Sequence, residues 1–352
     1  MTVKVLIVDD SPTMRAILSM MISSDPEIEV VGKADCPSTA RQMIKELNPD
    51  VMTLDIEMPG MDGLDFLEKV MRLRPMPVIM VSALTAAGAE ATLKAMELGA
   101  FDCFAKPALG FASDKSQSQT LISMIKAAAK NGGHRPLSFR NRSASAQNAA
   151  PAPSSVASGY RPKPGSIIAI GASTGGVETL LALLKDFPAN CPPTLIVQHM
   201  PPLFTASFAN RLDRMCPPKV SEAKTGDPLT PGHIYIAPGG ERHLEFQNAA
   251  HGPRCLLVSD EPMSGHRPSV DRLFLSVAKN CGRRAIGIIL TGMGQDGAMG
   301  LKAMRDTGSF TIGQDEESCV VYGMPAAAYR MGAVESQLPL SRIAAKALEA
   351  CA

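Results

Sequence analysis

The sequence contains no tryptophan, and aromatic residues make up only 4% of its 352 residues. A surface that stacks nucleobases or sugars on aromatic rings is therefore poorly supplied. No apolar run approaches the roughly 18 residues that a membrane-spanning helix needs. The formal net charge of +1 shows no general excess of either sign. This balance argues against a basic nucleic-acid coat protein and against an acidic tail protein.

Paired cysteines and metal-binding clusters are also missing from the sequence. None of the eight cysteines belongs to a C-x-x-C pair, and the six histidines do not cluster with them. No zinc site is therefore expected. The apolar run that ends at Val8 is too short for a signal peptide and is followed by two acids. We therefore expect a cytoplasmic protein whose thiols are reduced.

The length and composition predict two folded domains joined by a linker. Hydrophobic residues make up 45% of the chain, enough for packed cores, and the length favours two domains over one. Residues 132–164 have a different composition, because they are rich in Ala, Ser, Pro and Gly and contain no Asp or Glu. Their basic residues are Arg135, Arg140, Arg142, Arg161 and Lys163. We interpret this stretch as a flexible linker between a domain at 1–131 and a domain at 165–352.

Short apolar runs alternate with helical patterns on both sides of the linker. The strands expected in the first domain are 3–8, 28–31, 51–54, 78–81 and 101–104. The strands expected in the second are 166–170, 194–198, 234–237, 285–291 and 310–313. Alternation of this kind favours a parallel sheet covered by helices on both faces. The predicted fold is therefore α/β, with two doubly wound parallel-sheet domains.

Polar residues follow the predicted strands of the first domain. Asp9 and Asp10 end the first strand, Asp55 the third and Ser82 the fourth, and Lys106 follows the fifth. The carboxyl ends of parallel strands form the binding crevice of an open sheet. Three converging carboxylates require a cation, and a hard ion such as Mg²⁺ suits oxygen ligands. One carboxylate can then act as a nucleophile toward a phosphoryl group, while the lysine offsets charge on the transferring oxygens.

This layout, over the whole of the first domain, resembles the receiver domain of two-component response regulators. The resemblance implies that Asp55 accepts the phosphoryl group. It implies that Asp10 and Asp55 bind Mg²⁺ directly, that Asp9 does so through water, and that Glu57 contributes its backbone carbonyl. In the same pattern Ser82 and Lys106 correspond to the switch hydroxyl and to the lysine of the site.

One position departs from the receiver pattern. Receivers usually have Tyr or Phe three residues before the lysine, and this sequence has Cys103 there. Phe101 and Phe104 flank that cysteine. The usual aromatic switch is therefore in doubt, and a displaced aromatic ring is the alternative.

The second domain carries a serine, a histidine and an acid after three predicted strands. Ser173 lies in a glycine-rich turn between a strand and a helix, where a serine is exposed close to helix-terminal N–H groups. His199 directly follows another strand, and Asp296 lies in the loop after a third. The ends of these strands are neighbours in a doubly wound sheet, so the three side chains can meet. A nucleophile, a base and an orienting acid together indicate acyl-transfer chemistry.

Two other interpretations use the same glycines. A dinucleotide-binding turn requires G-x-G-x-x-G and an acid after the second strand, where this sequence has His199. An α/β-hydrolase orders its triad Ser…Asp…His, whereas the order here is Ser173, His199, Asp296. His233 lies at the wrong end of a strand, and surface positions are expected for the histidines in loops. These are His243, His251 and His266, of which only His266 is kept as a candidate on the substrate side.

The motifs GASTGG, VQHM, IAPGG, GHRPSVD, LTGMGQDGA and QDEESCVVYGMPAAA resemble the catalytic domain of chemotaxis protein-glutamate methylesterases, the CheB family. A receiver, a linker and this domain, in that order, form the organisation of that family. The resemblance implies Ser173 as nucleophile, His199 as general base and Asp296 as the residue that orients it. It also implies an oxyanion hole from the backbone around Thr174 and Met293.

The function implied by the resemblance is a phosphorylation-regulated serine hydrolase. It would demethylate glutamate γ-methyl esters on chemoreceptors, release methanol and receive its phosphoryl group from a histidine kinase. Mg²⁺ would be needed in the receiver only. Deamidation of receptor glutamines ranks second, because an amide is the harder leaving group. A non-enzymatic receptor-binding adaptor is the alternative, whereas nucleic-acid binding and membrane insertion are not expected.

Overall fold

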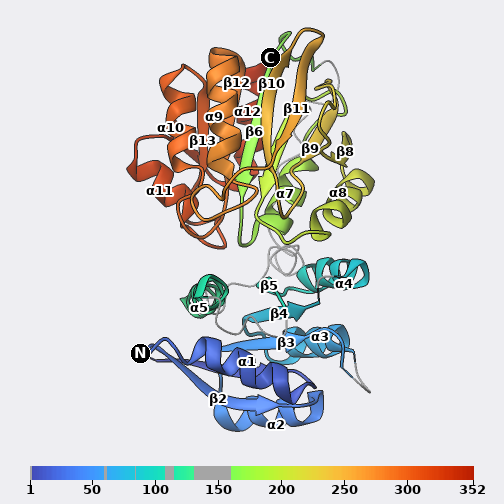
Figure 1. Cartoon of the computed structure of the whole chain (residues 1–352), viewed down its shortest axis with the longest axis vertical. Helices are drawn as coiled ribbons and strands as arrows, with labels where there is room; N and C mark the ends of the chain where they lie inside the picture. The colour runs from blue at the N-terminus through green and yellow to red at the C-terminus, as the bar shows by residue number, and fades with distance from the viewer. Residues whose placement is uncertain (1, 59–61, 84, 108–114, 131–159) are drawn as a thin grey trace, which may run out of the picture. The chain divides into compact units, whose positions relative to one another are not determined.

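The computed structural model describes residues 2–58, 62–83, 85–107, 115–130 and 160–352. The chain forms two compact units. The first contains a five-stranded sheet, and the second contains a seven-stranded sheet and a two-stranded hairpin (Figure 1). The predicted α/β fold is confirmed. Most of the predicted linker, 132–159, lies outside the described residues.

The sheet of the first unit is entirely parallel, with the order β2-β1-β3-β4-β5. Its strands are β1 (Val3–Val8), β2 (Ile28–Ala34), β3 (Val51–Asp55), β4 (Val78–Ser82) and β5 (Asp102–Ala105). Every residue of β3 and β4 is buried, as expected for central strands covered on both faces. The carboxyl ends of β1 and β3 are neighbours, so Asp9 lies beside Asp55.

Helices flank this sheet on both sides. They are α1 (Pro12–Ile22), α2 (Pro37–Leu47), α3 (Gly63–Leu73), α4 (Ala86–Glu97) and α5 (Lys115–Lys130). Helix α1 begins at an N-cap serine, Ser11, whose hydroxyl accepts a hydrogen bond from the Met14 amide. Helix α1 contacts α5 and α3 contacts α4, and Figure 1 shows α4 and α5 on opposite sides of the sheet.

The large sheet of the second unit is also parallel, with the order β14-β13-β12-β6-β7-β9-β8. Its strands are β6 (Ile167–Ala172), β7 (Thr194–Gln198), β8 (Lys219–Glu222), β9 (His233–Ile236), β12 (Ala285–Ile289), β13 (Phe310–Gln314) and β14 (Ser336–Leu338). The central strands β12, β6 and β7 are adjacent and wholly buried. The adjacency predicted for the loops that carry Ser173, His199 and Asp296 is therefore confirmed.

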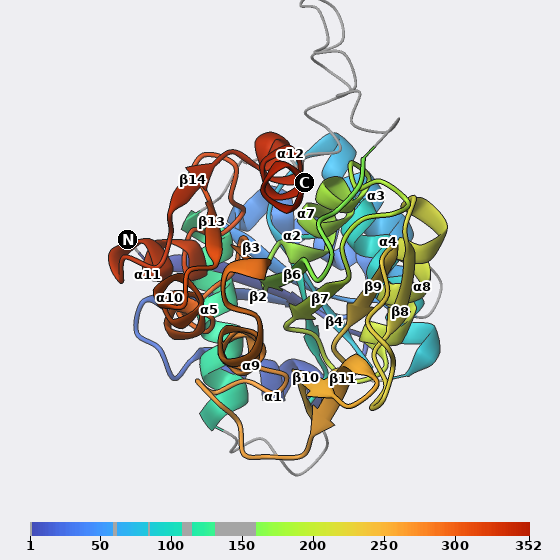
Figure 2. The same cartoon turned by 90° about the horizontal axis from the view of Figure 1, so that it is seen from above.

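The helices of the second unit form two layers around the sheet. They are α7 (Gly176–Leu184), α8 (Phe204–Met215), α9 (Val270–Cys281), α10 (Ala298–Asp306), α11 (Met324–Arg330) and α12 (Leu340–Cys351), with a short 3-10 turn at Gly282–Arg284. Figure 2 shows α7 and α12 on one face, and α9 and α10 on the other. None of the helices in the described part of the chain has the length and apolar character needed to span a bilayer.

An antiparallel hairpin occupies part of one face, where only parallel strands and helices were expected. Its strands are β10 (His243–Ala249) and β11 (Gly252–Val258). Leu244, Phe246 and Cys255 are buried in the core with α9. Alternate residues of a hairpin face opposite sides, so one side of this hairpin covers the sheet much as a helix would. The edge strands β8 and β14 and helix α11 were also missed, because each is short.

The end of the predicted linker contacts the second unit. Tyr160 is only 9% exposed, and its hydroxyl donates a hydrogen bond to the Leu348 carbonyl at 3.2 Å. The Lys163 amide donates to the Cys351 carbonyl at 2.7 Å. Residues from Tyr160 onward thus pack against helix α12, while the full extent of the linker stays a prediction.

Candidate active site

Ser173 lies in the tight turn between β6 and α7. Gly175 has a φ of 77°, a left-handed conformation that glycine adopts without steric cost. The Ser173 carbonyl accepts hydrogen bonds from the Gly176 amide at 2.7 Å and from Gln198 Nε2 at 2.9 Å. The hydroxyl is half-buried and makes no hydrogen bond to any described residue. The turn is therefore held by its backbone, and the hydroxyl is available for chemistry.

His199 lies at the end of β7, beside the end of β6. Its amide donates to the Ala172 carbonyl at 3.1 Å, and its Nε2 lies 2.8 Å from Oδ2 of Asp296. A carboxylate only accepts hydrogen bonds, so Nε2 carries the hydrogen and Nδ1 carries the lone pair. Nδ1 is buried and has no hydrogen-bond partner. Nδ1 is therefore the basic atom, in the opposite sense to a chymotrypsin triad, where Nδ1 faces the acid.

Asp296 rests on the N-terminus of helix α9. Its carboxylate accepts hydrogen bonds from the Ser269 hydroxyl at 2.8 Å and from the amides of Val270 at 2.7 Å and Asp271 at 3.0 Å. Burial alone would raise the pKa of Asp296. The hydrogen bond and charge of His199, with the two helix amides, outweigh burial and hold that pKa below its usual range. The acid is therefore ionised when it faces the imidazole.

A second carboxylate, Asp271, ties α9 to α10. It accepts hydrogen bonds from the Gly300 amide at 2.7 Å and from the Ser264 hydroxyl at 2.9 Å. Burial raises the pKa of Asp271. Helix α9 thus donates to Asp296, which lies in the loop before α10, and helix α10 donates to Asp271, which lies on α9. The sequence interpretation missed Ser269 and Asp271, although a serine just before a helical pattern is a recognisable N-cap signal.

The loops after β6 and β12 touch each other beside Ser173. The Ser173 amide donates to the Thr291 carbonyl, and the Thr291 hydroxyl donates to the Thr174 carbonyl, both at 3.0 Å. A Cβ added to Gly292 would lie 2.8 Å from Cβ of Ser173, so only glycine fits there. The amides of Thr174 and Met293 donate no hydrogen bond within the described part of the chain. The oxyanion hole stays a prediction, and these two free amides support it.

Among the remaining histidines, His243 differs most from expectation. His243 is not a surface loop residue but is fully buried at the start of β10. Its Nδ1 accepts from the Ser269 amide at 3.2 Å, and its Nε2 lies 3.0 Å from the Glu261 carbonyl. It therefore supports the segment that holds Asp296. His251 is exposed, as expected. His266 stacks on His199, with ring centroids 3.9 Å apart and planes within 6°.

His199, His266 and Asp296 lie close enough together to be considered as a metal site. The arrangement fits a metal poorly. The lone pair of an imidazole lies in the ring plane, so two parallel stacked rings cannot both direct a lone pair at one ion. Asp296 also already accepts the Nε2–H group of His199. The cluster therefore fits proton transfer better than metal binding.

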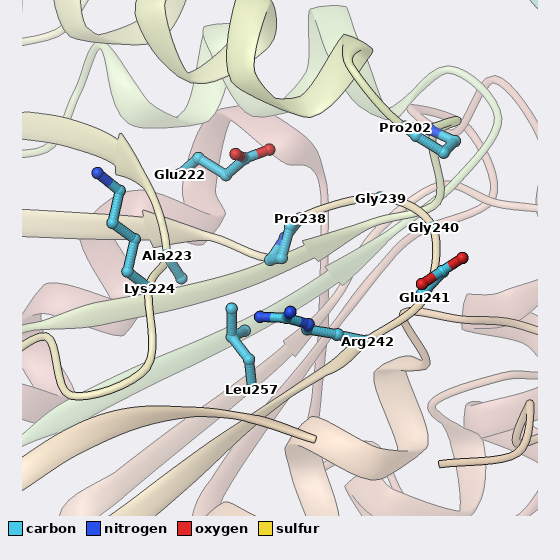
Figure 3. A pocket seen from close by; sticks show the side chains of 10 residues that line it. All are labelled: Pro202, Glu222, Ala223, Lys224, Pro238, Gly239, Gly240, Glu241, Arg242 and Leu257. Atoms are coloured by element: carbon cyan, nitrogen blue, oxygen red, sulfur yellow. The ribbon is translucent and has the colours of Figure 1, made fainter. Parts of the chain in front are cut away.

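A cavity of about 460 Å³ opens beside the loop that carries His199. Figure 3 shows Arg242 crossing it toward Leu257, with Lys224 and Glu222 on its wall. Glu222 accepts a hydrogen bond from the Thr205 hydroxyl at 2.6 Å. Among the described residues, no carboxylate forms an ion pair with Lys224 or Arg242. Two cations, Lys224 and Arg242, and two carboxylates, Glu222 and Glu241, thus line the cavity without pairing with one another.

The acidic site of the first unit lies at the carboxyl ends of β1 and β3. Asp9 and Asp55 are almost completely buried, at 0% and 1% exposure. Nζ of Lys106 lies 2.6 Å from Asp55 and 3.2 Å from Asp9. Burial raises the pKa of both acids against the influence of that lysine. The predicted convergence of these side chains is therefore present.

The donor set of this site fits a divalent cation. Oxygens of Asp9, Asp10 and Asp55 lie within 4.8 Å of one another. The buried Oδ2 of Asp9 makes no hydrogen bond, although Lys106 is near it. One ammonium cannot offset three carboxylates, and carboxylate oxygens are what Mg²⁺ prefers. The acidic cluster thus suits Mg²⁺, while the individual ligands stay predictions.

The other predicted receiver residues lie around this cluster. Ser82 is buried at the end of β4, and its hydroxyl donates to the Ala83 and Gly88 carbonyls at 3.3 and 3.4 Å. The Glu57 amide donates to Asp55 at 3.3 Å, with its side chain exposed. Cys103 is half-buried in β5, and Phe104 is buried.

The two aromatic rings beside Cys103 are not equivalent. Phe104 lies in the core at 6% exposure, whereas Phe101 precedes β5 and is half-buried. A core ring that changes rotamer must displace its close-packed neighbours. Phe101 is therefore the better candidate for a displaced switch, and this role stays a prediction.

We expect Asp9→Asn to stabilise the metal-free first unit. Because the folded pKa of Asp9 is raised, its ionisation favours unfolding. The stability associated with the neutral form is complete below the unfolded pKa and is lost as pH rises through the folded pKa. At neutral pH the variant should therefore unfold at a higher temperature in a chelator. In the wild type, Mg²⁺ at a hundredfold excess over its Kd should add about 2.7 kcal/mol, and the variant should lose much of this gain.

Differential scanning calorimetry with EDTA or MgCl₂ checks this expectation. Glu68→Gln is a matched control, because it removes one negative charge from an exposed position on α3. It should change neither the unfolding temperature nor the Mg²⁺ effect appreciably. An Asp9→Asn protein that gained as much from Mg²⁺ as the wild type would contradict a role for Asp9 in the cation site.

Two family profiles match this chain. The profile of the CheB methylesterase family matches residues 168–347, and that of the response regulator receiver domain matches residues 5–110. Together they match most of both folded units, while α5 lies beyond the receiver match. The solved structure of the Thermotoga maritima CheB methylesterase catalytic domain matches 53% of this chain and 99% of its own length, with a TM-score of 0.52 and 38% identity.

Relatives from several bacteria match the chain along nearly its whole length. A "Protein-glutamate methylesterase/protein-glutamine glutaminase" of Agrobacterium fabrum is 56% identical over 98% of this chain and 96% of its own. A relative in Caulobacter vibrioides, carrying that name with the number 1, is 55% identical over 99% and 97%. The Escherichia coli K12 protein of the first name is 47% identical over 98% and 96%. The resemblance noted in the sequence is therefore confirmed, and the chain belongs to the CheB family of protein-glutamate methylesterases.

Proposed function

We propose that this protein hydrolyses glutamate γ-methyl esters on chemoreceptors through Ser173, His199 and Asp296. The observation that carries the proposal is the state of the His199 ring. Nε2 is bonded to an ionised, helix-bound acid at 2.8 Å, and the buried Nδ1 has no partner. An imidazole held in this way has its Nδ1 lone pair available, so it can act as a general base at that atom.

In the first half of the reaction, Nδ1 of His199 accepts the proton of the Ser173 hydroxyl. The serine oxygen attacks the ester carbonyl and forms a new C–O bond. The amides of Thr174 and Met293 stabilise the oxyanion that develops. Collapse of this intermediate breaks the bond to methoxide, which leaves as methanol after taking the proton from His199.

In the second half, water replaces methanol. His199 accepts a proton from the water, whose oxygen attacks the acyl carbonyl. The bond to Ser173 breaks and the serine recovers its proton. The product is a glutamate carboxylate, so each turnover restores one negative charge to the receptor helix.

Asp296 supports both halves, because His199 becomes an imidazolium in each. The negative charge of Asp296 stabilises that cation and keeps the hydrogen on Nε2. The two α9 amides and the Ser269 hydroxyl hold the carboxylate in place. They also keep it ionised, so the proton is not passed on to the acid.

The same residues support deamidation of receptor glutamines as a second activity. The names of the Agrobacterium fabrum and Escherichia coli relatives include protein-glutamine glutaminase. Attack by Ser173 would form the same acyl-enzyme, with ammonia as the leaving group. Ammonia is expelled less readily than methanol, so the ester should react faster than the amide.

The first unit supplies regulation through phosphorylation of Asp55. Bound Mg²⁺, held by Asp9, Asp10, Asp55 and the Glu57 carbonyl, would offset the charge on the phosphoryl oxygens. Lys106 already contacts the Asp55 carboxylate at 2.6 Å, and it would stay close to the added phosphoryl group. The phosphoryl group carries about −1.5 to −2 charge, in place of the single negative charge of the carboxylate. A cytoplasmic histidine kinase is the proposed phosphodonor.

Asp55→Asn should abolish activation without abolishing hydrolysis. An amide cannot accept the phosphoryl group, whereas the residues of the esterase site are unchanged. Methanol release from methylated receptor membranes, with and without a small phosphodonor and Mg²⁺, measures both activities. We expect the wild-type rate to rise by about tenfold for each 1.4 kcal/mol that phosphorylation shifts the equilibrium between inactive and active forms.

The comparison with Asp65→Asn, an exposed acid on α3, separates loss of the acceptor from loss of a charge. This control should respond to the phosphodonor as the wild type does. Activation of the Asp55→Asn protein to the same extent would exclude Asp55 as the acceptor. Absence of methanol release from every protein would favour the non-enzymatic adaptor.

A further inference from the structure

We propose that His266 is a positioning residue that holds the His199 imidazole in the orientation required for proton transfer. The inference rests on the proposed function and concerns the same reaction. The two rings are nearly parallel, at 6°, with centroids 3.9 Å apart. This geometry is that of a flat ring packed against one whole face of the catalytic base.

His199 needs such support because its hydrogen bond to Asp296 does not prevent the ring from rotating. Nε2–H donates to Asp296 Oδ2, and no described residue is bonded to Nδ1. The covalent bond to Cβ and one hydrogen bond at Nε2 fix two points of the ring and leave it free to turn about the line that joins them. Turning would change the direction of the Nδ1 lone pair, which the proposed proton transfer requires to face the Ser173 hydroxyl, while the bond to Asp296 was kept. A ring against the face of His199 opposes this rotation.

His266 is itself held firmly by a tight turn. The amide and carbonyl of Met263 pair with those of His266 at 3.1 and 3.0 Å. The two central residues, Ser264 and Gly265, have φ values of 54° and 79°. Two successive positive φ values define a type I′ turn. Nδ1 of His266 lies 2.9 Å from the Ser264 carbonyl, so that nitrogen donates and the ring plane is set.

The turn belongs to a segment that is anchored on both sides. Arg267 donates from Nε to the Gly240 carbonyl at 3.1 Å and from its guanidinium to the Asp260 carbonyl at 2.9 Å. The Ser264 hydroxyl bonds to Asp271 at 2.9 Å. Two residues after Arg267, Ser269 donates to Asp296. One continuous segment thus carries both Ser269, which bonds to Asp296, and His266, whose ring stacks on His199.

The charge state of His266 suits this role. The titratable groups that act on it are His199, after β7, and Asp296, after β12. Burial and then the charge of His199 lower the pKa of His266, against the opposite effect of Asp296. A neutral ring therefore packs on His199 even when His199 becomes the imidazolium. Two stacked cations would instead repel each other and open the pair.

The experiment compares His266→Ala with His266→Phe in the full chain. The alanine variant removes the packed face, and we expect a fall in kcat of about 100-fold with no change in KM. Phenylalanine keeps a flat ring without the ring nitrogens, so it should recover most of kcat. His251→Ala is the matched control, because His251 is exposed in the β10–β11 turn. Circular dichroism and thermal unfolding check that each variant is folded.

Two measurements distinguish this proposal from the proposed function. Methanol release from methylated receptors gives kcat and KM, and the rate at which an organophosphorus reagent labels Ser173 reports nucleophile activation without any receptor. Slow labelling in His266→Ala with recovery in His266→Phe supports positioning, even if receptors prove not to be the substrate. Wild-type values for His266→Ala in both assays would overturn it. An equal loss in both variants would also overturn it, because the ring nitrogens rather than the stacked face would then be required.

Discussion

Ser173→Ala should lower methanol release by about 10⁶-fold while the fold is retained. The expected loss is large because alanine removes the side-chain oxygen that would attack the ester carbonyl. The fold should survive because the hydroxyl makes no hydrogen bond to any described residue, and the turn is held through its backbone. Methanol release and thermal unfolding, measured on the same preparation, check the two expectations.

Ser341→Ala provides the control, since Ser341 is exposed in the first turn of α12. It should hydrolyse methyl esters at the wild-type rate. Methanol release from the Ser173→Ala protein at an unchanged rate would end the assignment of the nucleophile. A variant that lost activity and also unfolded at a much lower temperature would contradict the expectation that the hydroxyl has no structural role.

Asp296→Asn should lower kcat by about 10⁴-fold. The amide can donate a hydrogen bond to Nε2 of His199, which would place the ring hydrogen on Nδ1. That nitrogen could then no longer accept the proton of Ser173. The amide also carries no negative charge to stabilise the imidazolium. The measurement is kcat for methanol release over a range of pH, so that a shift in pH optimum is not mistaken for a loss of rate.

Asp296→Asn should also reduce stability, because the carboxylate caps helix α9. Its folded pKa is lowered, so its contribution to stability is present above the unfolded pKa and is lost as pH falls through the folded pKa. Ser269→Ala removes one hydrogen bond to the acid but keeps its charge, so its loss of kcat should be much smaller. Asp306→Asn, an exposed acid on α10, is the control for a change of charge. Equal kcat losses for Asp296→Asn and Ser269→Ala would contradict the charge and tautomer argument.

Much of the fold was predictable because parallel α/β sheets leave strong local patterns. A central strand is covered on both faces, so it appears as an unbroken apolar run, and β7 was predicted with its observed bounds, Thr194–Gln198. The elements that were missed are short or lie at an edge, such as β8, β14 and α11. The β10–β11 hairpin was missed because its place on the sheet depends on contacts with α9, which no local pattern shows.

The sequence alone located the three candidate residues of the esterase site at the ends of strands. Ser173, His199 and Asp296 follow strands whose carboxyl ends are adjacent in any sheet of this type, so their convergence follows from strand order. The acids and the lysine of the first unit converge for the same reason. Periodicity and turn chemistry are local properties, and they place each residue at the end of its strand without knowledge of the packing.

Only the tertiary structure decided how His199, the proposed base, is oriented and supported. His199 and Asp296 are separated by 97 residues, and the bond through Nε2 rather than Nδ1 depends on the side from which the acid approaches. The α9 amides under Asp296, the buried His243 and the stacked His266 arise because segments distant in sequence are packed together. Side-chain rotamers and ring planes are set by that packing, so a one-dimensional pattern identifies the participants and the folded core sets their geometry.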